Sequence, residues 1–500
     1  MKLTLAAKRT LMAIFVAIVA AIYVIAWLAP ALGLFGGEAS VLATAKAIAS
    51  GHGYIVESLP TPVPQTSLPP LFPLLLAIFV KISDHAQWLK ILPLGCAAAW
   101  LFITFRLLRK MGAEHWGAVL LTVIAAASPM VVFESTHLLP ETLLAFLISA
   151  SLLALLDDRM FLAGALAALA TLTSYASLPL IAASALTLTA RGRFRRAIVF
   201  TSTAVLIAGP WCAWAAVHAI PSAQRHIAAN ERAFMMGINL ISVFGGPFEL
   251  LSGINDLYAA IFTFILIAWC IWKLRRIVPD LFLLLYAAML LFWPGPPVQL
   301  LAPVLPLILW LLWRVFRSVR LQEALAAAAL LIALVPLWTD AARIPVTLRT
   351  GNFPYSSRRP NDWNQMRRLF NAIRKNTPPD AILIANPAPL YYLNTGRKAI
   401  PGYAPNLYTT FYQPGGKSVS PDQLFAALRS GAAGYIVLTP NEDFPDSAAF
   451  HKSVQALERG GVLEPVPVPG LTPEYRLLRG ASAGGVASLG AGDVASVRVR

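Results

Sequence analysis

Long apolar runs recur along this chain, and they constrain its fold more than any other feature. Many of them approach the roughly 20 residues that an α-helix needs to cross the hydrocarbon core of a bilayer. Lipid offers no hydrogen-bond partner to a backbone N–H or C=O group, so each crossing run has to be a helix. The composition agrees, because 57% of the residues are hydrophobic and only 13% are charged. The sequence therefore predicts a polytopic α-helical membrane protein.

About eleven of these runs are predicted to be transmembrane helices. They are residues 11–33, 88–108, 115–133, 140–156, 160–175, 176–190, 197–217, 257–273, 278–294, 298–315 and 321–338. A further run, residues 71–80, is too short to cross, so we expect a juxtamembrane or re-entrant helix there. With that run left out, most Lys and Arg residues before residue 341 fall on one face of the membrane, as the positive-inside rule requires.

This topology divides the chain into three parts. Residues 1–340 form the predicted transmembrane domain, with outer loops at 34–87 and 218–256. Residues 341–480 form a predicted α/β domain on the outer face, and residues 481–500 a disordered tail. The net charge of +16 is spread over short clusters between apolar runs, so nucleic acid is not an expected partner.

Alternating patterns after residue 360 predict the small α/β domain. The predicted helices are residues 361–376, 421–430 and 449–460, and the predicted strands are 381–385, 434–438 and 474–478. The first helix is amphipathic, with Trp363, Met366 and Phe370 on one face. Asn394-Thr395-Gly396 has the chemistry of a helix stop.

Five segments occur in an order that resembles the GT-C superfamily of integral-membrane glycosyltransferases. They are GGEASVLATAKAIASGHGY (Gly36–Tyr54), LPPLFPLLLAIF (Leu68–Phe79), STHLLPETLLAFL (Ser135–Leu147), QLLAPVLPLIL (Gln299–Leu309) and NTPPDAILIANPAPLYYLNTGRKAI (Asn376–Ile400). The resemblance is nearest to the bacterial relatives of dolichyl-phosphate-mannose–protein mannosyltransferases, including the lipid A aminoarabinose transferases. It implies transfer of a sugar from a polyprenyl-phosphate donor to a glycan, lipid or protein acceptor. The implied location is the bacterial inner membrane, with the C-terminal domain in the periplasm.

The resemblance implies an acidic catalytic residue at the start of the first outer loop. The family pattern begins with an acidic pair and has a tyrosine further on, and this chain has Gly37, Glu38 and Val41 in that register. Glu38 is therefore the predicted general base, because a hydroxyl is a poor nucleophile until a base removes its proton. We expect Glu38→Gln to abolish transfer and leave folding nearly intact. The alternative is a carboxylate that only favours a helix N-terminus.

Glu141 is the second predicted catalytic residue. It follows Pro140 at the start of a span and resembles the second outer-face acid of the family. The alternative is again a charge at a helix N-terminus. His137 and Glu141 share an i, i+4 face, which leaves a divalent metal open but predicts no definite metal site or cofactor. Glu134 is expected to be solvated.

Several polar residues of the outer loops are candidates for binding the substrate. They are Lys46, His52, Tyr54, His137, Arg225, His226 and Arg232. A lipid-phosphate leaving group needs cations or dipoles that stabilise its developing charge. Many members of the family have R-Y-L-L-P before a late span, but here Gln299 stands in the place of the arginine.

Two other functions stay open at this point. Gly37 and Gln299 stand where the family has functional residues, which favours a catalytically silent homologue that only binds a lipid-linked sugar. The other alternative is a transporter or flippase. Transporters usually have repeated halves and a site near the bilayer midplane. The sequence shows neither a repeat nor a buried charge pair, so this alternative is the less favoured one.

Overall fold

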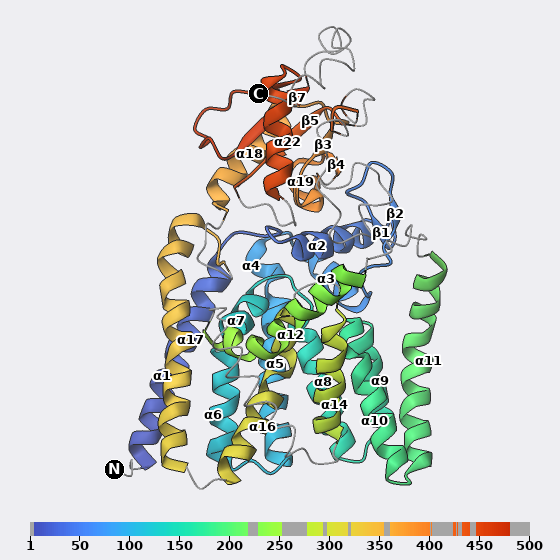
Figure 1. Cartoon of the computed structure of the whole chain (residues 1–500), viewed down its shortest axis with the longest axis vertical. Coiled ribbons are helices and arrows are strands. Elements are labelled where there is room, and N and C mark those ends of the chain that lie inside the picture. Colours follow the sequence, from blue (N-terminus) through green and yellow to red (C-terminus); the bar gives the residue numbers. More distant parts are fainter. Residues whose placement is uncertain are drawn as a thin grey trace.

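The computed structural model has a helical bundle with a small α/β domain at one end (Figure 1). It describes residues 5–218, 229–252, 278–293, 298–318, 322–354, 361–400, 402, 424–426, 428, 433–440 and 447–480. Helix α2 (Gly36–Ala49) lies across the end of the bundle that faces this domain (Figure 1). We call this end of the bundle the domain end. The predicted tail at 481–500 lies outside the described residues.

Fifteen described helices make up the bundle. They are α1 (Leu5–Leu28), α3 (Leu71–Ile82), α4 (Ala86–Leu89), α5 (Ile91–Lys110), α6 (His115–Ala126), α7 (Pro129–Thr136), α8 (Glu141–Leu156), α9 (Met160–Thr171), α10 (Leu178–Ala190), α11 (Phe194–His218), α12 (Ala229–Ser252), α14 (Val278–Leu291), α15 (Val298–Leu301), α16 (Leu305–Ser318) and α17 (Gln322–Thr350). The 3-10 turns η1 (Tyr175–Ser177) and η2 (Ala302–Val304) connect them.

A few of these helices are long and apolar enough to cross a membrane as single helices. Within the described ranges, Ala86–Lys110 and Phe194–His218 are long and apolar enough, and α6 with α7 makes a third candidate. The run at residues 71–80 forms the short helix α3, as predicted. The count of eleven spans stays a prediction, and the run 257–273 lies outside the described residues.

The predicted span 115–133 is not one straight helix. Helices α6 and α7 meet at a bend of 64°. Pro129 opens α7, and a proline disfavours the helical conformation in the residue before it, here Ser128. As a result α7 turns into the bundle, and all eight of its residues are buried.

Helices extend further than predicted in two places. The outer loop 218–256 contains the 24-residue helix α12, whose Gly237, Gly245 and Gly246 lower the helix propensity of its sequence. The last span was expected to end near Trp338, but α17 continues to Thr350. It continues because polar side chains within it are buried against the bundle; Arg343 and Asp340 form an ion pair of 3.2 Å.

Close packing between α9 and α11 depends on a glycine. A Cβ at Gly164 would lie 2.5 Å from the carbonyl oxygen of Phe200 and 3.0 Å from Cβ of Thr203. We expect Gly164→Ala to lower the free energy of unfolding by about 1 to 3 kcal/mol, because neither contact can relax without moving backbone. SDS titration of the purified protein measures this effect. Gly95→Ala on α5 is the matched control, since its Cβ meets nothing within 4 Å; equal stability of the two variants would contradict the prediction.

The C-terminal domain contains a five-stranded sheet of order β4-β3-β5-β7-β6. Its strands are β3 (Ile382–Ile384), β4 (Lys398–Ile400), β5 (Tyr435–Leu438), β6 (Leu463–Pro465) and β7 (Arg476–Gly480), and its helices are α18 (Trp363–Asn376), α19 (Ala388–Thr395) and α22 (Ser447–Arg459). Strand β3 pairs in parallel with β4 and β5, and β7 is antiparallel to β5 and β6. The predicted α/β pattern is therefore present, and α19 ends at Gly396 with φ +74°, as its sequence predicted. Most of the predicted helix 421–430 lies outside the described residues.

Helix α2 is packed between the bundle and the domain. Val41, Leu42 and Ala45 belong to the core of the bundle. Ala39 belongs to the core of the C-terminal domain, which α2 reaches by packing against α19. Because both of its sides are covered, α2 holds its polar side chains in a fixed position between the two parts. A short antiparallel pair, β1 (Ile55–Val56) with β2 (Val63–Pro64), follows it.

Candidate active site

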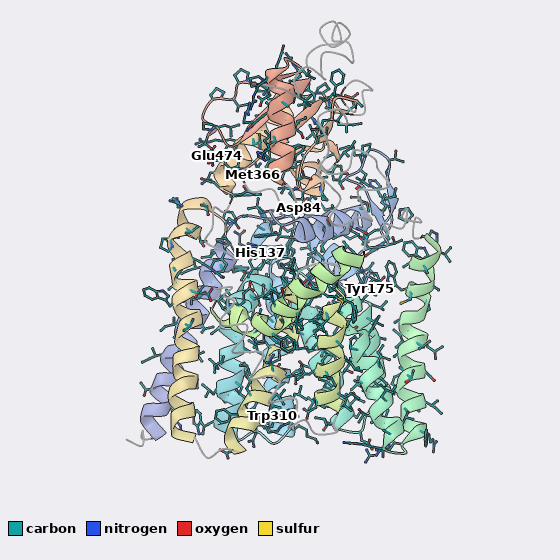
Figure 2. All side chains as sticks on the ribbon, viewed as in Figure 1. Asp84, His137, Tyr175, Trp310, Met366 and Glu474 are labelled. Carbon is teal, nitrogen blue, oxygen red and sulfur yellow. The ribbon has the colours of Figure 1, made fainter. Side chains whose placement is uncertain are left out.

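A cavity of about 270 Å³ lies where α2, α3, η1 and the first turn of α8 meet. We call it the polar cavity. Its lining residues are Val41, Ser67, Leu68, Pro69, Phe72, Pro73, Pro140, Glu141, Thr173, Ser174, Tyr175, Trp293, Gln299 and Leu300. Figure 2 shows one of them, Tyr175, near the domain end of the bundle, with Trp310 at the opposite end. Four of the five segments that resemble the GT-C pattern contribute to this lining.

Glu141 supplies the carboxyl group of the polar cavity. It is the first residue of α8, where the preceding Pro140 favours a helix start and the helix dipole favours a negative charge. Its Oε2 atom is shielded from solvent and has no hydrogen-bond partner in the structure. A buried polar atom without a partner is costly, so such atoms call for an explanation. An oxygen that accepts a proton from a bound substrate would explain why this atom has no partner in the protein.

The remaining polar groups of the cavity are uncharged. They are the hydroxyls of Ser67, Thr173, Ser174 and Tyr175 and the amide of Gln299. Ser67 is oriented, because its hydroxyl donates to Oε1 of Gln65 at 2.8 Å. No Lys or Arg is among the described residues that line the cavity. This set suits a neutral ligand that carries several hydroxyl groups.

Glu38 lies beside the polar cavity but does not line it. Its side chain is fully buried. Its Oε2 accepts a hydrogen bond from the backbone N–H of Gly33 at 2.7 Å, and its Oε1 accepts one from Leu138 at 3.0 Å. The carboxylate thereby joins the segment before α2 to the corner that leads into Glu141. The assignment of Glu38 as a base stays a prediction, whereas this geometry favours a positioning role.

Lys90, which was not among the predicted site residues, balances the buried charge of Glu38. It is fully buried, and its ammonium donates to the carbonyl of Ala29 at 2.7 Å. Burial raises the pKa of the Glu38 carboxyl, while the nearby Lys90 charge and the two backbone N–H groups act in the opposite direction. A lysine at the edge of an apolar run usually extends to the interface, so the burial of Lys90 could not be predicted from the sequence.

His137 is held between aromatic rings rather than exposed to substrate. It is buried, its ring centroid lies 4.2 Å from that of Phe133 and 5.2 Å from that of Phe35, and its Nδ1 is 2.8 Å from the carbonyl of Phe133. Burial and the Lys90 charge lower the pKa of His137 to about 3. His137 is therefore neutral at ordinary pH and donates Nδ1–H to Phe133. Its role in binding substrate stays a prediction.

The depressed pKa of His137 predicts a loss of stability in acid. An unfolded histidine takes up a proton below its reference pKa of about 6.5, whereas the folded one does not do so until about pH 3. Stability should therefore fall as the pH drops below 6.5, by up to about 1.4 kcal/mol per pH unit from this group alone. Thermal unfolding in detergent between pH 7 and 5 measures it. His137→Asn should show a shallower pH dependence, and equal slopes would contradict the assignment.

Glu134 is not solvated, contrary to the expectation. It is 2% exposed, and its Oε1 has no hydrogen-bond partner in the structure. The cause is the bend before α7, which turns this helix into the bundle.

The candidates of the first outer loop do not line the polar cavity and have partners of their own. Lys46 pairs with Asp84 at 3.1 Å, and His52 pairs with Glu57 at 2.6 Å. The Tyr54 hydroxyl donates to the carbonyl of Leu68, a cavity residue, at 2.8 Å. Their substrate-binding roles stay predictions.

The other candidates are described only in part. Arg225 and His226 lie outside the described residues, and of Arg232 the structure gives only its place in α12. Gly37 is exposed, and a Cβ there would meet only Leu139 at 3.8 Å, so the fold would accept the aspartate of the family pattern. The described ranges contain no grouping of three or more potential metal ligands.

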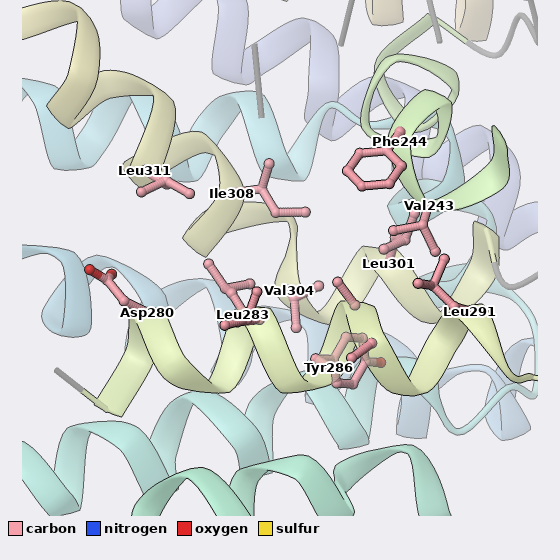
Figure 3. A pocket seen from close by; sticks show the side chains of 13 residues that line it. Val243, Phe244, Asp280, Leu283, Tyr286, Leu291, Leu301, Val304, Ile308 and Leu311 are labelled. Carbon is pink, nitrogen blue, oxygen red and sulfur yellow. The ribbon is translucent and has the colours of Figure 1, made fainter. Parts of the chain in front are cut away.

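A second cavity of about 200 Å³ lies deeper in the bundle, between α12, α14 and α16 (Figure 3). Aliphatic and aromatic side chains line most of it, including Val243, Leu283 and Ile308, and Asp280 is the one acidic residue among the described lining residues (Figure 3). We call it the apolar cavity. The two cavities adjoin, because the hydroxyl of Tyr286 in the apolar cavity donates to the carbonyl of Leu300 in the polar one at 2.6 Å.

The fold of this chain matches solved membrane glycosyltransferases. ArnT from Cupriavidus metallidurans bound to undecaprenyl phosphate superposes with a TM-score of 0.56 at 13% identity, over 94% of this chain and 98% of that one. Its apo state gives 0.55 at 13% identity, over 97% and 100%. The oligosaccharyltransferase of Archaeoglobus fulgidus, tethered to an acceptor peptide, gives 0.50 at 15% identity, over 85% of this chain and 68% of that one. No protein-family model and no curated protein sequence matches the chain.

Proposed function

We propose that this chain, whose fold is that of the GT-C superfamily of membrane glycosyltransferases, transfers a sugar from a polyprenyl-phosphate donor to an acceptor hydroxyl. The observation that carries the proposal is the polar cavity. Segments far apart in the sequence, around Val41, Glu141 and Gln299, line this one space together with an unpartnered carboxyl oxygen. A solved structure with the same fold binds undecaprenyl phosphate.

In the proposed reaction, Glu141 acts as the general base. Its free Oε2 accepts the proton of the acceptor hydroxyl as the acceptor oxygen bonds to the anomeric carbon of the sugar. The bond from that carbon to the phosphate oxygen breaks, and the polyprenyl phosphate leaves with the bonding electrons. Glu38, through its hydrogen bond to Leu138, keeps the corner before Glu141 in place. The cavity hydroxyls and the Gln299 amide orient the sugar.

The two cavities suit the two ends of such a donor. An isoprenoid chain needs an apolar environment, which the apolar cavity offers. The sugar needs the hydroxyls of the polar cavity. The phosphate has no cation among the described lining residues, so we assign its stabilisation to Arg225, His226 and Arg232, as the sequence predicted. The proposed setting is the bacterial inner membrane, with the C-terminal domain in the periplasm.

Transfer of label tests the proposal. The purified protein in nanodiscs is incubated with a panel of radiolabelled polyprenyl-phosphate sugars and membrane extract as the source of acceptor. The expected result is label in a water-soluble or lipid product for one donor, and none with boiled protein. Binding of a donor without transfer from any of them would favour the silent homologue. Movement of intact donor between leaflets without transfer would favour a flippase.

A further inference from the structure

Helix α12 lines the apolar cavity and also reaches the wall of the polar cavity through one side chain. Val243 and Phe244 of this helix lie at the end of the apolar cavity where Leu291 lies (Figure 3). One helical turn before Val243, Asn239 is 1% exposed. Its amide nitrogen donates to the carbonyl of Trp293 at 2.7 Å and to that of Leu291 at 3.2 Å. Asn239 is thereby bonded to the chain on which Trp293 enters the polar cavity.

The two hydrogen bonds of Asn239 fix the point where the walls of the two cavities meet. Leu291 is the last residue of α14 and lines the apolar cavity, and Trp293 lines the polar cavity two residues later. The last four carbonyl groups of an α-helix have no partner within the helix. The amide of Asn239 satisfies one of them, at Leu291, and also binds a carbonyl beyond the helix end. The direction of the chain after α14 is therefore set by α12.

Helix α12 is itself firmly attached to the bundle. The Ser128 hydroxyl donates to the carbonyl of Leu250, near the end of α12, at 2.6 Å. A Cβ at Gly246 would lie 2.2 Å from Cδ1 of Leu301, so the backbone of α12 packs directly against this residue of the apolar cavity. A side chain on a rigid element can hold another residue in a precise place. Asn239 has such a support.

A helix cap without influence on the site is the simpler interpretation of Asn239. Such a cap is usually satisfied by water at its remaining polar atoms. Here the Oδ1 atom of Asn239 is buried and has no hydrogen-bond partner among the described residues. A buried polar atom without a partner lowers stability and calls for an explanation. The shorter of the two hydrogen bonds also goes to Trp293, which lies outside the helix.

We propose that Asn239 is a positioning residue for the sugar site and acts through Trp293. It fixes the part of the polar cavity wall that follows α14, so that the cavity keeps the shape that holds the sugar beside Glu141. Because a displacement of about 1 Å can lower a rate by about 100-fold, a residue outside the cavity can determine the rate of transfer. Asn239 also fixes Leu291, so the lipid end and the sugar end of the donor share one support. The inference rests on the proposed function.

Asn239→Leu tests the inference, because leucine has the same number of side-chain heavy atoms but no donor group. With the donor identified by the label-transfer panel, kcat/KM should fall by about 10- to 100-fold. Asn376→Leu is the matched control. It removes an amide hydrogen bond to the carbonyl of Ala372 at the end of α18, in the C-terminal domain, and should keep the wild-type kcat/KM.

A double variant separates a positioning role from a general structural one. If Asn239 acts through Trp293, Asn239→Leu combined with Trp293→Leu should transfer as slowly as Trp293→Leu alone. Losses of kcat/KM that multiply in the double variant would mean that Asn239 acts elsewhere, which overturns the inference.

Hydroxyl-radical footprinting of the full-length protein in nanodiscs gives a readout that does not depend on transfer. Oxidation of Trp293 should rise by about 2-fold or more in Asn239→Leu, because the hydrogen bonds that hold this corner are lost. Oxidation of Trp100, which is buried in the bundle, should stay unchanged. This result in a protein that transfers nothing would keep the role of Asn239 in shaping the cavity and reject the enzyme. Unchanged oxidation of Trp293, an equal rise at Trp100, or wild-type transfer by Asn239→Leu overturns the inference.

Discussion

Glu141→Gln is expected to reduce the turnover of sugar transfer by about 100- to 10,000-fold, which is the usual contribution of a general base. The amide has nearly the shape of the carboxyl group but cannot accept the proton of the acceptor. Because Oε2 has no hydrogen-bond partner, the substitution breaks no bond of that atom. Donor binding and folding should therefore change little. The measurement is kcat with the donor identified by the label-transfer panel, beside donor affinity.

Asp84→Asn is the matched control for this substitution. It makes the same change of carboxylate to amide outside the polar cavity, at an exposed residue whose partner is the half-buried Lys46. Surface ion pairs contribute about 0 to 1 kcal/mol, so its turnover and stability should remain close to those of the wild type. Wild-type turnover in Glu141→Gln would reject Glu141 as the base and return the role to Glu38.

Glu38→Gln is expected to lower the free energy of unfolding by about 3 to 5 kcal/mol, as when one partner of a buried charge pair is removed. The carboxylate of Glu38 accepts hydrogen bonds from the backbone N–H groups of both Gly33 and Leu138. A glutamine has only one acceptor oxygen and could accept only one of them in the same arrangement. Lys90 would also keep a buried charge without its counter-charge. The structure thus changes the expectation that folding stays nearly intact. SDS titration followed by tryptophan fluorescence measures the loss.

A double-mutant cycle with Lys90→Met tests the cause. If Glu38 and Lys90 stabilise each other, the double variant should be destabilised by clearly less than the sum of the single variants. Strict additivity would mean that the two charges act independently. Wild-type stability in Glu38→Gln, with transfer lost, would instead support Glu38 as the catalytic base that the sequence predicted.

Local patterns in the sequence predicted much of the fold. Helix α3 was predicted because ten apolar residues cannot cross a bilayer, and α18 because its apolar residues follow the helical period. The bend before α7 was missed, since hydropathy continues unbroken through Pro129. The helix α12 was missed because glycines interrupt its pattern. The polar residues 341–350 continue the helix α17 because their side chains have buried partners. Such partners come from distant segments and cannot be identified from the local sequence.

Site residues that lie in a recognisable motif could be predicted from the sequence. Residues that reach the site only through packing of distant segments could not. Glu141, a predicted catalytic residue, lines the polar cavity, and so does Gln299, which was noted only for standing in the place of the family's arginine. Burial cannot be read from a single charge, so the sequence missed Lys90 and placed Glu134 in solvent. Asn239 was missed because it and Trp293 are far apart in the chain and meet only in the fold.

Photocrosslinking of a polyprenyl phosphate at the polar cavity tests the central claim most directly. Benzoylphenylalanine is introduced at Ser67, an exposed residue of the cavity lining, and in a separate protein at Thr61, an exposed residue outside it. Both are irradiated in nanodiscs that contain radiolabelled undecaprenyl phosphate. We expect labelling at Ser67 that clearly exceeds labelling at Thr61 and is competed by unlabelled undecaprenyl phosphate but not by phosphatidylglycerol. Equal labelling at the two positions, or competition by both lipids, would contradict the assignment of this cavity as the donor site.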